Sequence, residues 1–131
     1  MWPGEAAERR LAMEISTRLS EQLGQYVTLA SDEAKLTAAN MANVDTPGFH
    51  TLGMDFEGEM RSAMTRVDTG VPTGAVNVQE VDGLVSRPDG NNVSVDRESM
   101  HLAEAQLRFK AGVTLLRLEY QKVMDAIHAD K

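Results

Sequence analysis

The stretch Ala39–Phe49, which reads ANMANVDTPGF, decides how this chain of 131 residues is organised. Pro47 disfavours helical geometry at Thr46, and Gly48 can adopt the positive φ that a type II turn requires after proline. The stretch therefore predicts that a long helix stops here and that the chain then turns.

Two asparagines precede this turn, Asn40 and Asn43, about one helical turn apart. Their side chains can bond the backbone carbonyls or amides left open at a helix end. Phe49 follows the turn and is expected to act as an apolar anchor. On the stop signals alone, an ordinary asparagine-rich helix terminus is a better explanation of this pattern than a functional motif.

Upstream of the turn, apolar and small residues recur at spacings of three and four, which places them on one face of a helix. They are Leu19, Leu23, Tyr26, Ala30, Ala34, Thr37, Met41 and Val44. Gly24 costs a helix about 1 kcal/mol relative to alanine, and Ser31–Glu33 can interrupt it. We expect a first helix over residues 13–46 that is marginal on its own.

Downstream, a stronger apolar stripe within residues 93–131 predicts a second helix, over about residues 95–129. Its helix-packing seam consists of Leu102, Phe109, Val113, Leu116, Tyr120, Val123 and Ile127. Ser94 is the expected N-cap, with Asp96 and Glu98 in the first turn, where the helix dipole favours acids. Packing of the seam against the first helix and packing against other subunits both remain open.

Between the two helices, residues 47–92 are rich in glycine and proline. Brief alternation at Val76–Val78 and Val93–Val95 predicts short strands. Aspartate-glycine pairs, which favour turns, occur twice, at Asp82-Gly83 and Asp89-Gly90. The predicted fold class is mainly α, with two long terminal helices packed as a coiled-coil-like hairpin and joined by an irregular insert with short β-strands.

The composition excludes several classes of protein. A net charge of −7 argues against a general nucleic-acid binder, because neutralising phosphates needs clustered lysine and arginine. The absence of cysteine excludes disulfides and thiolate zinc sites. No stretch approaches the roughly 20 apolar residues of a transmembrane helix. The charged residues 1–15 lack the apolar core of a cleaved signal peptide.

No arrangement of residues predicts catalysis, a cofactor or a metal. His50, His101 and His128 are too scattered for a zinc pair one helical turn apart. A calcium loop starting at Asp89 would need glycine and glutamate where Ser94 and Met100 stand. We therefore expect no catalytic, cofactor-binding or metal site, and no enzymatic activity.

The helix-stop stretch resembles the Ala-Asn-(apolar)-Ala-Asn-x-x-Thr-Pro-Gly-aromatic signature of the flagellar basal-body rod and hook family. The similarity extends through Met54–Phe56. The segment Gly90–Phe109 is similar to that of proximal rod members of this family. Other rod and hook members usually carry Gln-Arg-Ala-Tyr where this chain has Gln106–Phe109, and distal members carry larger inserted domains.

This resemblance covers roughly residues 29–56 and 83–127, and it implies a structural subunit of the proximal, periplasmic part of the bacterial flagellar basal-body rod. It further implies export by the flagellar type III apparatus without a cleaved signal peptide, and polymerisation through the terminal helices. The implied partners are copies of the chain, other flagellar rod proteins, membrane-ring and rod-adaptor proteins at the rod base, and the export apparatus.

The resemblance also assigns the motif residues that fix the helix exit and a neighbouring contact. They are Asn40, Asn43, Thr46, Pro47, Gly48 and Phe49. Because similar chains begin near the position of Met13, residues 1–12 are expected to be an N-terminal extension or the product of an upstream start-codon assignment.

Two non-enzymatic alternatives remain open at this point. The first is another rod subunit of the same family, and the second is a soluble adaptor that binds an amphipathic helix in a groove. Filament formation separates the adaptor from both rod subunits, and position along the rod separates the rod subunits from each other.

Overall fold

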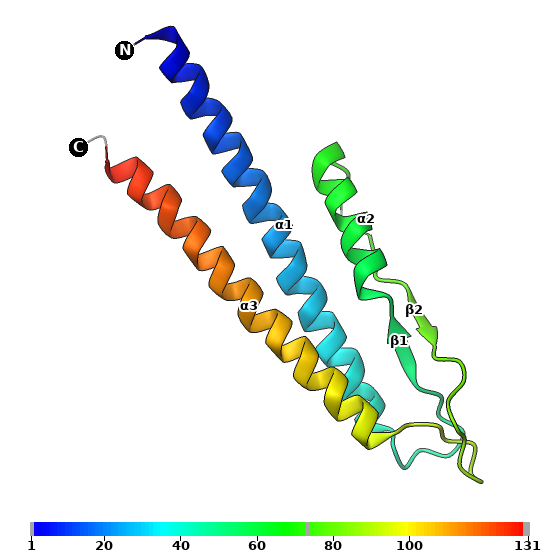
Figure 1. Ribbon diagram of the computed structural model, residues 1–131. Helices are drawn as coiled ribbons and strands as arrows, with labels where there is room; N and C mark the ends of the chain where they lie inside the picture. Colours follow the sequence, from blue (N-terminus) through cyan, green and yellow to red (C-terminus); the bar gives the residue numbers. More distant parts are fainter. Residues whose placement is uncertain (1, 73, 130–131) are drawn as a thin grey trace.

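The computed structural model describes residues 2–72 and 74–129. Along the chain it has α1 (Pro3–Ala42), β1 (Leu52–Met54), α2 (Phe56–Thr69), β2 (Val78–Glu80) and α3 (Val95–His128). Figure 1 shows α1 and α3 lying side by side and antiparallel, with α2 and the strands on the other side of α1. The prediction of a mainly helical chain is confirmed.

The first helix is longer at its start and shorter at its end than the sequence suggested. It begins at Pro3, where proline is tolerated because the first helical residues have no intrahelical acceptor for their N–H groups, and it runs without a break through Gly24. It ends at Ala42 rather than near residue 46, because the N–H of Val44 bonds the carbonyl of Met41 and tightens the last turn.

The prediction of an irregular insert was wrong over residues 56–69, which form α2. The side chain of Asp55 caps this helix by accepting a hydrogen bond from the N–H of Gly58 at 3.1 Å. Gly70 ends it with a left-handed φ of 70°. Both capping signals stand in the sequence, but the glycines around them favoured a loop.

The strands were placed only partly by the sequence. β1 and β2 pair antiparallel, with Leu52 opposite Glu80 and Met54 opposite Val78. Of the two predicted strands, Val76–Val78 is present two residues later as β2, whereas Val93–Val95 leads directly into α3. The turns predicted at the aspartate-glycine pairs are confirmed, since Gly83 and Gly90 have φ values of 78° and 84°.

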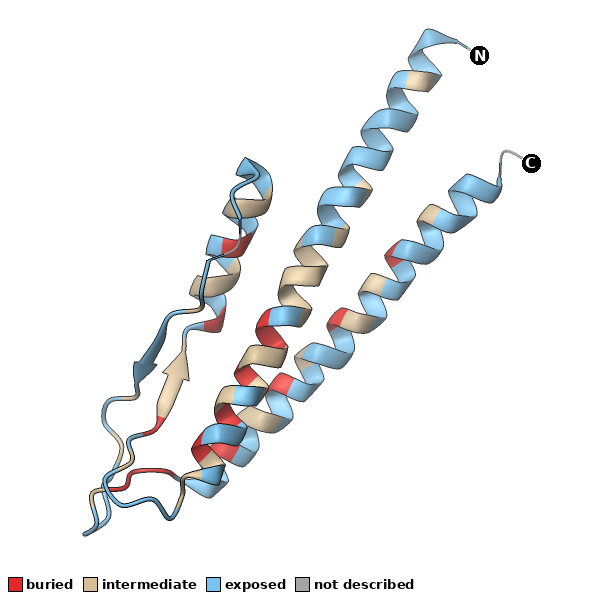
Figure 2. Ribbon diagram, turned by 180° about the vertical axis from the view of Figure 1, so that it is seen from behind, coloured by how far each residue is buried: buried red, intermediate tan, exposed pale blue. Residues whose placement is uncertain are grey.

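The α3 residues that are buried against α1 are small or acidic. On α3 the buried residues repeat every seven positions, and they are Glu98, Ala105, Gly112 and Glu119. Figure 2 shows these buried positions concentrated where the two helices face each other. At Gly112 a Cβ atom would lie 2.8 Å from Val27 Cγ2 and 2.9 Å from Tyr26 Cδ1, so only glycine permits this close approach.

A small apolar core joins α2 to α1. It consists of Leu29, Ala30, Phe56 and Ala63. The ring of Tyr26 meets that of Phe56 edge to face, with centroids 5.4 Å apart. The guanidinium of Arg108 lies over the Phe56 ring, 4.3 Å from its centroid. The three helices therefore meet around one aromatic ring.

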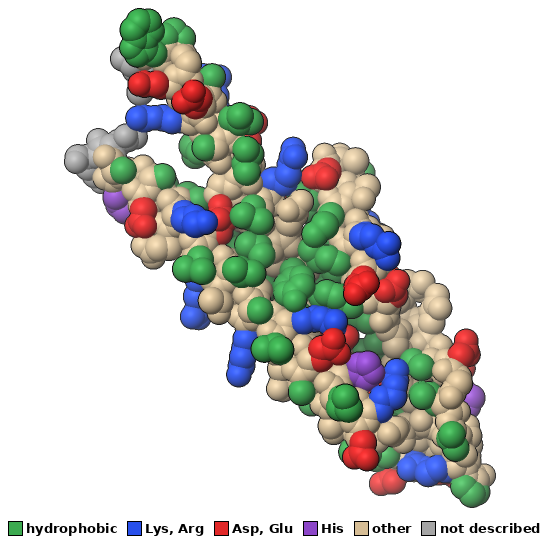
Figure 3. Space-filling model, viewed as in Figure 1, with side chains coloured by type: hydrophobic (Ala, Val, Ile, Leu, Met, Phe, Trp, Pro, Cys, Tyr) green, Lys and Arg blue, Asp and Glu red, His purple; other side chains and the backbone are tan. Residues whose placement is uncertain are grey.

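Much apolar surface is left uncovered in the outer halves of the two long helices, as the hydrophobic side chains in Figure 3 show. On α1 the exposed large residues include Leu11, Met13, Ile15 and Leu19, and on α3 they include Leu115, Leu118, Tyr120, Met124 and Ile127. Among the described residues, no helix is long and apolar enough to cross a membrane.

Candidate assembly site

The first motif asparagine ties the end of α1 to both the sheet and α3. The amide nitrogen of Asn40 donates to the Leu52 carbonyl at 2.7 Å and to Glu98 Oε2 at 2.9 Å. Its Oδ1 accepts from the N–H of Leu52 at 3.0 Å, so the side chain bonds β1 as a neighbouring strand would. Asn40 and Glu98 are almost fully buried.

A second bond set joins the turn after α1 to the segment before α3. The side-chain oxygen of Asn92 accepts from the N–H of Thr51 at 2.6 Å and from its hydroxyl at 2.9 Å. The backbone N–H of Asn92 in turn donates to the Phe49 carbonyl at 3.3 Å. These bonds thus hold together two loop segments that lie about forty residues apart in the sequence.

Asn91 also binds the segment before α3 to the helix-stop turn. Its amide donates to the carbonyls of Asn43 at 2.9 Å and Thr46 at 2.8 Å. The side chain of Asn43 donates to Ala39 O at 2.8 Å, which satisfies a carbonyl at the end of α1. We call Asn40, Asn43, Asn91 and Asn92 the asparagine latch.

The motif glycine permits the close packing of the two loops. Gly48 has a positive φ of 74°, as the sequence predicted, and its N–H donates to the Asp89 carbonyl at 2.8 Å. A Cβ added at Gly90 would lie 3.3 Å from the Cα of Gly48. Pro47 remains exposed beside this contact, and Phe49 is half-buried.

The sequence marks Asn40 and Asn43 as helix-end residues, but it does not indicate that they lie near Asn91 and Asn92. Those two residues carried a prediction only through the family resemblance and the rejected calcium loop. Thr51 was not predicted, and Glu98 was expected only in the first turn of α3, although both side chains are buried. Polar residues without apolar periodicity gave no signal of burial.

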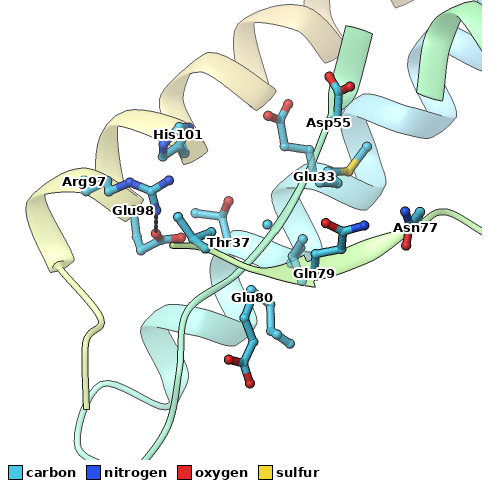
Figure 4. Close-up of a pocket in the computed structure, with 14 residues that line it drawn as sticks. Glu33, Thr37, Asp55, Asn77, Gln79, Glu80, Arg97, Glu98 and His101 are labelled. Atoms are coloured by element: carbon cyan, nitrogen blue, oxygen red, sulfur yellow. Dashed lines mark hydrogen bonds and ion pairs between the residues drawn. The ribbon is translucent and has the colours of Figure 1, made fainter. Parts of the chain in front are cut away.

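A cleft of about 450 Å³ lies between the sheet and the two long helices (Figure 4). Glu98 in this cleft is bonded by Arg97 at 2.8 Å and by Asn40. Asp55 caps α2, and Glu80 lies 3.1 Å from His50. These carboxylates are held in structural contacts. The geometry therefore favours a cleft that joins the sheet to the helices over a catalytic site with a free acid and base.

Arg108 extends the same polar interface along α3. Its guanidinium donates to Glu33 Oε2 at 2.8 Å and to Glu104 Oε1 at 2.9 Å. Burial works to lower the pKa of Arg108, but the hydrogen bond and charge of Glu33, with the charges of Glu104 and Tyr26, raise it on balance. The guanidinium therefore stays charged and fixes the register of α3 against α1.

The residues of the predicted helix-packing seam are not among the buried residues of α3. Leu102, Val113, Leu116 and Val123 are half-buried. Phe109, Tyr120 and Ile127 are 40%, 55% and 52% exposed. The buried positions of α3 are instead the residues that repeat every seven positions from Glu98.

No group of three or more His, Asp or Glu residues that could hold a metal ion occurs in residues 2–72 and 74–129. His50 and His101 each face one glutamate, and His128 lies near the end of α3.

No family model matches the chain. It is similar to three curated proteins named flagellar basal body rod protein FlgB. The one from Salmonella typhimurium is 31% identical over 121 residues, which cover 79% of this chain and 88% of the relative. Those from Proteus mirabilis strain HI4320 and Escherichia coli strain K12 are 28% and 24% identical, and they cover 76% and 80% of this chain.

The first of these similarities covers 79% of this chain, so it extends into both long helices. The agreement between this similarity and the motif at the end of α1 leads to one conclusion: the chain belongs to the FlgB family of flagellar basal body rod proteins.

Proposed function

We propose that this protein is a non-enzymatic subunit of the proximal part of the flagellar rod, and that it polymerises through α1 and α3. The observation that carries this proposal is the uncovered apolar surface on the outer halves of both helices. Isolated apolar residues are common on protein surfaces, but rows of them along two adjacent helices are typical of interfaces.

The difference in packing between the two ends of the molecule supports the same proposal. The asparagine latch and the Phe56 cluster fix one end of the molecule, where the helices contact each other closely. Toward the opposite end, in the described part of the chain, large apolar side chains of both helices are exposed, and a hydrogen bond from Ser16 to Glu119 joins α1 to α3. That end gains apolar burial only when neighbouring subunits cover it, and there α1 and α3 would pack as a coiled-coil-like pair.

Export and location follow from this proposal. We infer that the chain leaves the cytoplasm through the flagellar type III apparatus and joins other rod proteins, with membrane-ring and rod-adaptor proteins at the rod base. A chain with a small core supports this inference, because little free energy is needed to unfold it for passage through a narrow channel. The motif residues from Asn40 to Phe49 would fix the helix exit during assembly.

A charge placed on the seam tests the proposed role. Tyr120→Asp puts a carboxylate on an exposed seam position, so the fold should tolerate it whereas a packed interface should not. We expect normal amounts of protein in the cell but basal bodies without a complete rod, scored by electron microscopy. Ser99→Asp, which adds the same charge at an exposed polar position of α3, is the matched control.

Normal motility with the Tyr120→Asp variant would contradict assembly through the seam. Loss of rods in the Ser99→Asp control would mean that added charge on α3 is harmful wherever it is placed.

A further inference from the structure

One face of α1 carries a glycine that the fold does not explain. Gly24 lies inside a 40-residue helix, where glycine costs about 1 kcal/mol relative to alanine. A Cβ atom at Gly24 would meet nothing within 4 Å, in contrast to Gly112, which must be glycine for α3 to fit. The space over Gly24 is open to a side chain from another molecule.

Two unpaired acids share this face. Glu14 and Glu21 are exposed and lie ten and three residues before Gly24, spacings that bring all three to one side of the helix. Among residues 2–72 and 74–129, neither acid has an ion pair; Arg18, which lies between them, is paired with Asp68 at 3.6 Å. This face of α1 thus carries two carboxylates and, further along the helix, an open space over Gly24.

The outer face of α3 carries the complementary pattern. Lys110 and Arg117 are exposed and unpaired within the described part of the chain, and basic side chains project along this edge of α3 in Figure 3. Leu107, three residues before Lys110, is 68% exposed. This face therefore offers one large apolar side chain followed by two cations.

The two patterns match in an antiparallel register. From Gly24 the steps back to Glu21 and Glu14 are three and seven residues, and from Leu107 the steps forward to Lys110 and Arg117 are also three and seven. Since α1 and α3 are antiparallel within one chain, two copies that point the same way bring α3 of one antiparallel to α1 of the other.

We propose that this face of α1 binds the outer face of α3 of a second copy, with Leu107 over Gly24, Lys110 at Glu21 and Arg117 at Glu14. The contact joins two different faces, so a row of copies keeps one free face of each kind at its two ends, and further copies add in the same orientation. The inference rests on the proposed function and names the partner and register of one of its contacts. Exposed ion pairs are weak singly, so the charges chiefly select the register.

Charge reversal with rescue tests the pairing. In bacteria lacking the native gene, the double variant Lys110→Glu, Arg117→Glu should give about tenfold fewer basal bodies with a rod, because both pairs become repulsive. The double variant Glu14→Lys, Glu21→Lys should show the same loss. A chain with all four changes should recover to within about twofold of the unchanged chain, since attraction is restored with opposite signs.

Two further variants examine the gap and the register. Gly24→Leu should leave the helical content of the purified chain unchanged yet cause a similar loss of rods, because the open space is filled. Since the chain has no cysteine, Thr17→Cys, Thr114→Cys should give a single new disulfide between copies in isolated rods. A chain with Ser62→Cys, Thr114→Cys, whose first position lies on α2, should give none.

Unchanged assembly by either reversed double variant, or a four-change chain as defective as the doubles, would overturn the pairing. The proposed function fails in a different way, namely if bacteria lacking the gene still build complete rods. If the unchanged chain and the reversed variants all restore complete rods, the rod role stands and only this contact is excluded.

Discussion

Replacing Asn40 by leucine is expected to lower the free energy of unfolding by about 3 kcal/mol, because several buried groups lose their partners at once. The change keeps the number and branching of the side-chain heavy atoms but removes the donor to Glu98 and both bonds to Leu52. Glu98 is only 2% exposed and would be left with Arg97 alone. Urea unfolding of the purified chain, followed by circular dichroism, measures the loss.

Asn43→Leu is the matched control for this prediction. It changes the same residue type in the same motif, but the side-chain bonds of Asn43 to Ala39 and Thr46 are exposed to water. We expect a loss below about 1 kcal/mol, since water can replace these bonds. Equal effects of the two substitutions would mean that the buried network around Asn40 does not stabilise the fold.

Replacing Gly112 by leucine is expected to lower the free energy of unfolding by about 3 kcal/mol through overpacking. The first atom of any side chain already lies under 3 Å from Val27 and Tyr26, so α3 must move away from α1. The leucine side chain also presses against Tyr26, whose ring packs edge to face on that of Phe56. Thermal unfolding should show a lower midpoint together with a changed tyrosine signal in near-ultraviolet circular dichroism.

Gly24→Leu is the control for crowding at Gly112. Both glycines lie inside long helices, but the space at Gly24 is open, so leucine there should leave the midpoint unchanged or raise it through its higher helix propensity. If Gly112→Leu proved as stable as Gly24→Leu, the close approach of the two helices would not be needed.

The parts of the fold that depend on local chemistry could be predicted from the sequence. Ser94 caps α3, as expected, by accepting from the N–H of Arg97 at 3.4 Å, and Gly48 takes the positive φ that the turn requires. Each of these outcomes follows from a residue and its near neighbours. The existence of two long helices likewise follows from apolar periodicity.

The parts that depend on contacts between distant segments could not be predicted in the same way. The apolar seam of α3 is the stronger periodic signal, yet Tyr120 lies outside the helix pair and Glu98 inside it. Glu98 can be buried only because Asn40, 58 residues earlier, bonds its carboxylate. A polar side chain whose partner is remote carries no periodicity that would mark it as buried.

α2 was missed for a different reason. Its cap at Asp55 and its terminator at Gly70 are local signals, but Gly58 inside the helix argued against it. Phe56 and Ala63 become buried only where α1 presents Leu29 and Ala30 to them. Tertiary packing therefore outweighed the unfavourable glycine.

The central claim is tested most directly by electron microscopy of purified basal bodies. They are taken from bacteria without this gene and from the same bacteria with the gene restored. The account predicts that the deletion leaves the inner-membrane ring without a rod above it and that restoration returns the rod. A complete rod in the deletion strain would contradict a role for this chain as a proximal rod subunit.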